Sequence, residues 1–178
     1  VFEQTYRDYE LLIVNDGSTD ETPDILESNR VQDSRVVVID KVHSGLTDSL
    51  NEGLAAARGR WVARLDSDDL CEPARLERQL AYAVANDTVL LGSGFLEIDE
   101  NGNGIKTHYY LHQHHRLVRN LERRKAFFPH SSAFLDRQIA LDAGGYNPRF
   151  LKSQDRDLWA RLAEAGRIAC LEEPLVRV

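Results

Sequence analysis

Three short apolar runs alternate with amphipathic stretches in the first half of the chain, and this order constrains the fold more than any other feature. The runs cover residues 10–15, 35–40 and 61–66, and their length suits buried strands. Each run is followed by a stretch with helical signals. Because parallel strands joined by helices produce this order, we expect an α/β fold with a mostly parallel central sheet and helices on both faces.

Helix signals occupy the intervals between these runs. Asp20 is a favourable N-cap, and Pro23 is tolerated in the first turn of the helix that follows. Apolar residues at spacings of three and four predict a second helix over 46–58, which Gly59 ends. We expect a third helix over 73–85.

The second half of the chain departs from this alternation and predicts a small antiparallel part. The turn signal at 101–104 (Asn-Gly-Asn-Gly) joins a strand over 89–98 to a return strand over 105–110. The remaining elements that we expect are a polar helix over 112–124, a short strand over 131–137, a helix over 155–165 and one or two edge strands over 167–178.

Length and charge limit the kind of protein that this can be. The 178 residues are enough for one domain with a sizeable core and too few for two ordinary domains. We therefore expect a single domain over 1–178, with a nucleotide-type half over 1–88 and an acceptor-type half over 89–178. The net charge of −7 gives no basic field that attracts phosphates, which argues against nucleic acid as a partner.

Cysteine usage and hydropathy predict a cytoplasmic location. Cys71 and Cys170 are the two cysteines, and they form neither a C-x-x-C pair nor a disulfide framework, which is typical of a reducing compartment. No apolar run approaches the roughly 18–20 residues that a membrane-spanning helix needs.

Two acidic turns follow predicted strands, at 16–20 (Asp-Gly-Ser-Thr-Asp) and at 65–69 (Leu-Asp-Ser-Asp-Asp). Ligands of α/β sheets bind beyond the C-terminal strand ends, where both turns fall. Strand alternation places Asp66 and Asp68 on one side, and two such oxygen ligands suit Mg²⁺ or Mn²⁺ with diphosphate oxygens completing the coordination. The alternative is an acidic turn in which Asp69 caps the next helix.

Three further positions carry chemistry or an ordinary structural role. Asp16, followed by Gly17, could accept hydrogen bonds from a base or ribose, or form a plain Asx turn. Arg58 could reach a diphosphate, or simply favour the helix C-terminus. Asp155 could be a general base that takes a proton from an attacking hydroxyl, or a carboxylate held by the helix dipole.

The histidines and one basic segment are weaker candidates. His112, His114 and His115 do not place a clean pair on one helix face, so their spacing argues against a zinc site. His130 could line a pocket, although a structural histidine fits as well. The segment 123–125 (Arg-Arg-Lys) reads as a solvated basic loop, or as a lid that meets phosphate.

Four motifs in this order make the chain resemble the GT-A family 2 glycosyltransferases of bacteria. The motifs are Val14–Asp20, similar to the family's uridine-side motif; Asn51–Arg58, in the helix before the metal motif; Leu65–Asp69, the D-x-D motif; and Gly144–Tyr146 with Gln154–Trp159, similar to the acceptor-side motif. The resemblance covers nearly the whole chain.

The resemblance implies inverting transfer of a sugar from a nucleotide diphosphate sugar, most often a UDP-sugar, with Mn²⁺ or Mg²⁺ as cofactor. The roles that we expect are metal coordination by Asp68, contact with metal or ribose by Asp66, nucleotide binding by Asp16, Gly17, Ser18 and Arg58, and deprotonation of the acceptor by Asp155. The resemblance also implies a glycan or lipid-linked acceptor in cell-envelope polysaccharide or glycan synthesis. It is compatible with peripheral association at the inner face of the membrane and with a homodimer.

The chain departs from the family pattern in two places. Gln154 stands where the family often has Glu, and Val1 already matches the helix that follows the family's first strand, so we expect that strand to be absent. The alternative reading is therefore a truncated or degenerate sugar-nucleotide-binding module without transfer. A sugar nucleotidyltransferase would instead carry a Gly-rich basic phosphate loop near its start, and residues 1–20 contain none.

Overall fold

The computed structural model describes residues 1–110, 113–125, 127–150 and 152–178. Its strands are β1 (Leu11–Asn15), β2 (Val36–Asp40), β3 (Trp61–Ala63), β4 (Leu70–Cys71), β5 (Thr88–Ile98), β6 (Gly104–His108), β7 (Phe134–Asp136) and β8 (Arg167–Arg177). Its helices are α1 (Thr22–Gln32), α2 (Leu46–Ala56), α3 (Arg75–Ala85), α4 (His114–Glu122), α5 (Arg137–Asp142), α6 (Gln154–Ala165) and the 3₁₀ turn η1 (His130–Ser132). None of the described helices is both long and apolar enough to cross a bilayer.

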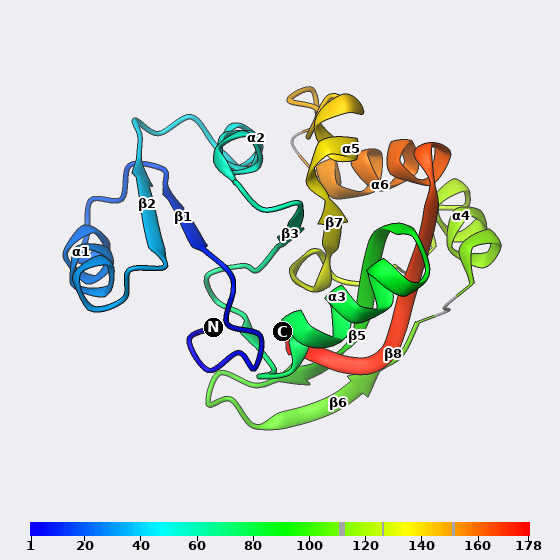
Figure 1. Ribbon diagram of the computed structural model, residues 1–178, viewed down its shortest axis with the longest axis horizontal. Coiled ribbons are helices and arrows are strands. Elements are labelled where there is room, and N and C mark those ends of the chain that lie inside the picture. The colour runs from blue at the N-terminus through cyan, green and yellow to red at the C-terminus, as the bar shows by residue number, and fades with distance from the viewer. Residues whose placement is uncertain (111–112, 126, 151) are drawn as a thin grey trace.

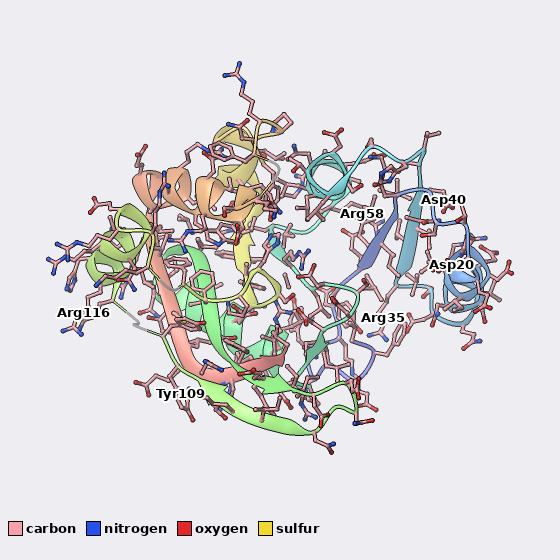
Figure 2. The ribbon with its side chains drawn as sticks, turned by 180° about the vertical axis from the view of Figure 1, so that it is seen from behind. Asp20, Arg35, Asp40, Arg58, Tyr109 and Arg116 are labelled. Carbon is pink, nitrogen blue, oxygen red and sulfur yellow. The ribbon has the colours of Figure 1, made fainter. Side chains whose placement is uncertain are left out.

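The strands form two sheets, which Figure 1 shows side by side. The small sheet pairs β1 with β2 in parallel, with α1 packed against β2 and α2 against β1. The large sheet has the order β3-β7-β5-β8-β4, and β6 pairs with the C-terminal part of β5, Phe95–Ile98. Figure 2, seen from behind, shows Asp20, Asp40 and Arg58 at the small-sheet end, and Tyr109 and Arg116 at the opposite end.

The α/β class is confirmed, but parallel pairing is more limited than we expected. It joins β1 to β2 and β5 to β8, while β3–β7, β5–β7, β5–β6 and β4–β8 are antiparallel. The reason is topological, because β7 runs antiparallel to both neighbours and separates β3 from β5. The central sheet is therefore mixed.

The core lies on both faces of the large sheet. On one face, Leu90 of β5 packs with Trp159 of α6 in a cluster that α4 also joins. On the other face, Leu91 packs with Phe134 and with Ala83 of α3. Neighbouring residues of a strand point to opposite faces, so β5 is covered on both sides, as the sequence predicted for the sheet.

Two expectations about the second half were wrong in detail. β8 is a central strand rather than an edge strand, because it lies between β5 and β4 and buries its run Ile168–Cys170. The polar helix α4 starts at His114, and His112 lies outside the described residues. In the first half, β3 is shorter than the predicted strand over 61–66 and ends at Ala63, so the acidic turn begins earlier than expected.

Candidate active site

The segment after β3 is held by the turn η1. Arg64 donates its backbone N–H to the carbonyl of Ala133 (2.9 Å), and Asp66 donates its own to Ser131 Oγ (3.0 Å). Ser131 Oγ in turn donates to Asp66 Oδ2 (2.8 Å). The hydrogen bonding of β3 therefore continues through the Ser131 side chain, which no sequence pattern singled out.

Asp66 is fixed in its ionised form. Its carboxylate forms an ion pair with Arg64. Burial raises the pKa of the Asp66 carboxyl, but the hydrogen bonds and charge of Arg64, with the Ser131 hydroxyl, outweigh burial and leave the pKa below its ordinary value. Asp66 is thus an anchored carboxylate beside the turn.

Asp68 projects from the turn and keeps its oxygens free. The turn closes through a hydrogen bond from Asp69 N–H to the Asp66 carbonyl (3.2 Å), so alternation along a strand does not relate Asp66 to Asp68. Asp68 is exposed and forms no hydrogen bond or ion pair with any residue that the structure describes. Asp69 does not cap α3, whose N-cap is Ala74.

Negative charge is concentrated at this turn. The pKa of the Asp69 carboxyl is raised, chiefly by burial and also by the negative charges of Asp66 and Asp68. A hydrogen bond with Ser131 acts in the opposite direction and is outweighed. In the described part of the chain, no three His, Cys, Asp or Glu side chains are arranged to hold a metal ion by themselves. One free carboxylate with anchored neighbours fits a cation that shares its coordination with a diphosphate, as Mg²⁺ sites commonly do.

A pair of polar rings lies next to this turn, with Tyr146 buried and His130 half-buried. His130 Nε2 and Tyr146 Oη are 2.9 Å apart, and both rings pack edge-on against Trp159. Burial, assisted by the charge of Arg64, lowers the pKa of His130 to about 3, so the ring is neutral at physiological pH. The sequence left the role of His130 open, and it placed Tyr146 in the Gly144–Tyr146 motif without assigning the phenol a role.

Tyr146 relates the acidic turn to Asp155. Burial raises the pKa of the Tyr146 phenol, and among the nearby charges those of Asp155 and Asp66 act in the same direction while that of Arg64 opposes them. Asp66 Oδ2 accepts from Ser131, next to His130 in η1, and Asp155 lies one turn before Trp159 in α6, against which the Tyr146 ring packs. Asp66, three residues after β3, and Asp155, in the first turn of α6, therefore belong to segments that meet around the His130–Tyr146 pair, although they are 89 positions apart in sequence.

Asp155 is half-buried and is not engaged in an ion pair with any described residue. The nearby carboxylate Asp157 takes that role, since Arg161 pairs with it at 2.5 Å, as the four-residue spacing suggested. Ser153 occupies the N-cap position in a left-handed conformation, but its side chain makes no capping hydrogen bond. Asp155 is thus left free at the positive end of the α6 dipole.

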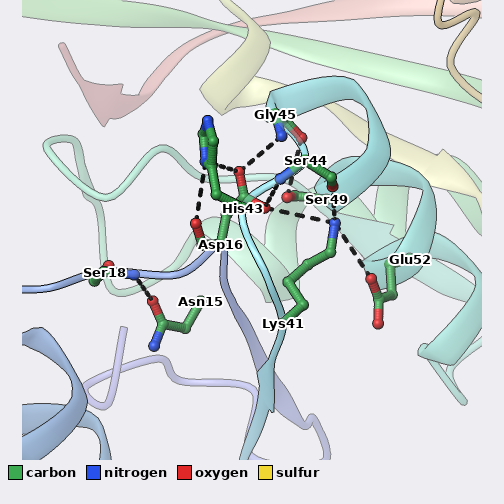
Figure 3. Close-up of polar contacts among 9 residues, drawn as sticks. All are labelled: Asn15, Asp16, Ser18, Lys41, His43, Ser44, Gly45, Ser49 and Glu52. Atoms are coloured by element: carbon green, nitrogen blue, oxygen red, sulfur yellow. Dashed lines mark hydrogen bonds and ion pairs between the residues drawn. The ribbon is translucent and has the colours of Figure 1, made fainter.

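Asp16 binds the loop that leads into α2 (Figure 3). Its Oδ1 accepts from the backbone N–H of Ser44, and its Oδ2 from that of Gly45, each at 2.9 Å. His43 Nδ1 lies 2.9 Å from Oδ2, and Lys41 Nζ lies 3.5 Å from Oδ1. The hydrogen bond from Ser44, with those from Gly45 and the Ser49 side chain and the charge of His43, outweighs burial and lowers the pKa of Asp16 to about 2.

This network gives Asp16 a structural role that we did not predict. Gly45 is the N-cap of α2, so the Asp16 carboxylate caps that helix from the end of β1. Gly17 has a positive φ of 79°, and Ser18 donates its N–H to Asn15 Oδ1 (3.0 Å), which shapes the turn. Nucleotide contact by Asp16, Gly17 and Ser18 stays a prediction.

Arg58 lies at the other end of α2 and is not brought together with Asp16. Its backbone N–H and its Nε both donate to the Glu10 carboxylate, each at 2.7 Å. This position is compatible with the alternative role, in which the Arg58 cation favours the C-terminal end of the α2 dipole. Binding of a diphosphate by Arg58 stays a prediction.

One residue of the histidine tract, His114, makes a contact between elements. His114 Nδ1 accepts a hydrogen bond from the backbone N–H of Ile168 (3.1 Å), which ties α4 to β8. The exposed residues of this helix and of the loop after it carry a basic surface, which consists of Arg116, Arg119, Arg123, Arg124 and Lys125.

Comparison of the chain with known proteins identifies its family. The family described as Glycosyl transferase family 2 matches residues 1–144, so Asp155 lies beyond the matched part. The O-antigen biosynthesis glycosyltransferase WbnJ of Escherichia coli is 33% identical over 163 residues, which are 91% of this chain and 63% of that protein. The amylovoran biosynthesis glycosyltransferase AmsE of Erwinia amylovora is 28% identical over 179 residues, which are 99% of this chain and 66% of that protein. This chain therefore spans less than two thirds of WbnJ and about two thirds of AmsE.

Two solved structures show the same fold at low sequence identity. Residues 1–349 of Staphylococcus aureus TarS, in complex with UDP, superpose with a TM-score of 0.80 at 18% identity, covering 99% of this chain and 53% of that one. The mannosyltransferase PcManGT from Pyrobaculum calidifontis, in complex with GDP-Man and Mn²⁺, gives 0.70 at 18% identity, covering 97% and 48%. The fold is thus of the GT-A type, and the chain belongs to glycosyl transferase family 2.

Proposed function

We propose that this domain transfers a sugar from a nucleotide diphosphate sugar to a hydroxyl of an acceptor, with inversion and with Mn²⁺ or Mg²⁺ as cofactor. The observation that carries the proposal is a chain of contacts between the two carboxylates: Asp66 bonds to Ser131 beside His130, His130 contacts Tyr146, and Tyr146 packs on Trp159, one turn after Asp155 in α6. These contacts join the acidic turn at 65–69, which suits a cation bound to a diphosphate, to Asp155, a free carboxylate that suits the role of general base. Family membership and the UDP and GDP-Man complexes of the structural neighbours support the donor class, and we favour a UDP-sugar.

The chemistry follows from the roles of single residues. Asp155 takes the proton of the acceptor hydroxyl while the acceptor oxygen bonds to the anomeric carbon and the bond from that carbon to the diphosphate breaks. Attack on the face opposite the leaving group inverts the configuration, and no covalent enzyme intermediate is needed. Asp68 would hold the cation, with Asp66 beside it, and the cation would supply charge stabilisation to the leaving diphosphate.

Two substitutions separate binding from transfer. Asp68→Ala should abolish metal-dependent UDP binding in calorimetric titrations with and without Mn²⁺, and unchanged binding would remove Asp68 from the metal site. Asp155→Asn should leave UDP affinity intact and lower transfer by roughly 10²–10⁴-fold, the usual range for a positioned base. Asp8→Ala, which removes another exposed carboxylate, is the matched control.

The same titrations decide between the proposal and its alternative. Metal-dependent UDP binding without release of any sugar, from a panel of donors read by mass spectrometry, would favour a binding module that does no transfer. Release of sugar that depends on Asp155 would favour the transferase. The names of WbnJ and AmsE support an acceptor in polysaccharide synthesis, which we propose here as a glycan or a lipid-linked glycan.

We also propose a cytoplasmic location at the inner face of the membrane. Cys71 and Cys170 are free thiols, as a reducing compartment favours. The five cations of the basic surface are exposed and have no ion pair within the described residues, and Figure 2 shows Arg116 at the outer side of α4. Anionic headgroups attract such cations by about 1 kcal/mol for each Lys or Arg.

Vesicle binding tests this location. The protein should sediment with vesicles that contain phosphatidylglycerol and not with pure phosphatidylcholine, and changing Arg116, Arg119 and Arg123 to Ser should abolish the difference. Equal binding of the triple variant and the parent would exclude the basic surface. Homodimer formation stays a prediction, which the mass measured by light scattering tests.

A further inference from the structure

One amide side chain joins the two halves of the domain beside the candidate site. Asn51, in the middle of α2, donates from Nδ2 to the carbonyl of Tyr146 (2.7 Å) and accepts at Oδ1 from the backbone N–H of Tyr146 (2.7 Å). These residues are 95 positions apart in sequence. Among side chains of this length, only Asn supplies both a donor and an acceptor, since Asp lacks the donor and Leu lacks both.

The loop that carries Tyr146 is shaped to receive this amide. Gly144 and Gly145 have φ angles of 89° and 64°, in the left-handed region that favours glycine. A Cβ at Gly145 would lie 2.6 Å from Asn51 Oδ1, so any other residue would displace the amide. The close approach of the loop to α2 therefore depends on glycine at this position.

A second contact holds the loop from the side of α6. Arg161 donates to the carbonyl of Ala143 at 2.5 Å and to that of Gly145 at 2.8 Å, while it pairs with Asp157. The loop is thus fixed between α2, through Asn51, and the helix that carries Asp155. Its backbone has little freedom to shift without breaking one of these contacts.

The other end of α2 reaches the nucleotide side. Ser44 and Gly45, at its N-terminus, bind the Asp16 carboxylate. Gly45 and Asn51 are six residues apart, which is about 9 Å along a helix. A single rigid element therefore contacts the end of β1 and the backbone of Tyr146, whose ring contacts His130 and packs against Trp159 of α6.

We propose that Asn51 is a positioning residue for sugar transfer. It holds the Tyr146 backbone, and through the Tyr146–His130 pair it fixes the spacing between the acidic turn and Asp155. This inference rests on the proposed function and deepens it. Asn51 acts on the alignment of donor and acceptor and not on donor affinity, so its loss lets water compete with the acceptor.

The test is Asn51→Asp, which keeps the size of the side chain and removes the amide donor. We expect an unchanged UDP dissociation constant and a higher ratio of donor hydrolysis to transfer. The kcat for transfer should fall by roughly 10–100-fold, because a misplacement of about 1 Å can cost about 10²-fold. Asn86→Asp is the matched control, because it removes an amide donor to the Tyr82 carbonyl (2.9 Å) within α3 and its C-cap. It should leave all three quantities unchanged.

A double-mutant cycle with Tyr146→Phe separates positioning from a general loss of structure. If Asn51 acts through Tyr146, the effects of the two substitutions on kcat should not add. Additive effects, or a kcat for Asn51→Asp equal to that of the parent, would overturn the inference. Should Asn51→Asp not fold, as judged by circular dichroism, Asn51→Ala replaces it and avoids a buried charge. A parent protein without any transfer would refute the proposed function instead, so the two failures are distinguishable.

Discussion

The neutral state of His130 makes stability depend on pH in a way that can be calculated. The folded protein lowers the pKa of this ring to about 3, chiefly by burial, whereas an unfolded histidine titrates near 6.5. The unfolded state binds more protons between these values, so the contribution is complete above about pH 6.5 and is lost as pH falls towards 3. At pH 5, about 1.5 units below the unfolded value, the loss is about 2 kcal/mol at 1.36 kcal/mol per unit.

The assay compares the parent with His130→Gln, whose amide can still bond to the Tyr146 hydroxyl but cannot titrate. The free energy of unfolding is measured in urea at pH 7.5 and pH 5, in buffer without divalent cations. The parent should lose about 2 kcal/mol more than the variant between the two pH values. Every other titrating group contributes equally to both proteins, so the difference isolates His130.

Two outcomes bear on this reasoning. Equal losses in the parent and in His130→Gln would show that the ring is not held neutral in the folded protein, and the argument from burial would be wrong. His115→Gln is the matched control, because it removes an exposed imidazole on α4. It should follow the parent at both pH values.

The remaining predictions concern the turn and the loop that frame the site. The lowered pKa of Asp16, about 2, contributes stability that is complete above about pH 4 and lost as pH falls through 2, so Asp16→Asn should show a flatter acid titration in urea. A titration as steep as that of the parent would contradict the capping role. Gly145→Ala should lower the free energy of unfolding by more than Gly102→Ala, by about 1–3 kcal/mol, because both have positive φ but only at Gly145 would a Cβ meet a neighbour. Equal losses would show that the contact with Asn51 costs nothing.

Local patterns predicted most helices and strands of the first half. The alternation of apolar runs identified β1, β2 and their helices, because each element there carries its own period and its own turn residues. The acidic turn at 65–69 does follow a strand, although β3 ends at Ala63 and not at residue 66 as predicted. The helix α5 was missed although a local signal existed, since Asp136 accepts from the backbone N–H groups of Gln138 and Ile139 as an N-cap.

Contacts between distant segments could not be predicted in this way. The central place of β8 depends on its pairing with β5 and β4, and an apolar run does not state which neighbours a strand has. Asn51 bonds to the backbone of Tyr146, and His130 bonds to the Tyr146 hydroxyl, and neither contact has a periodic signal in the sequence. Ser131 looks like any serine before a strand. Such long-range polar contacts appear only once the fold has brought the segments together.

The central claim is that the acidic turn and Asp155 act on one bound donor beside Tyr146. The most direct test is a crystal of the protein with UDP and Mn²⁺, in which anomalous scattering locates the metal. We expect a Mn²⁺ peak at about 2.0–2.2 Å from a carboxylate oxygen of Asp68, with the diphosphate on the side that Tyr146 and Asp155 share. A peak away from this turn, or a diphosphate on a face that Asp155 cannot reach, would contradict it.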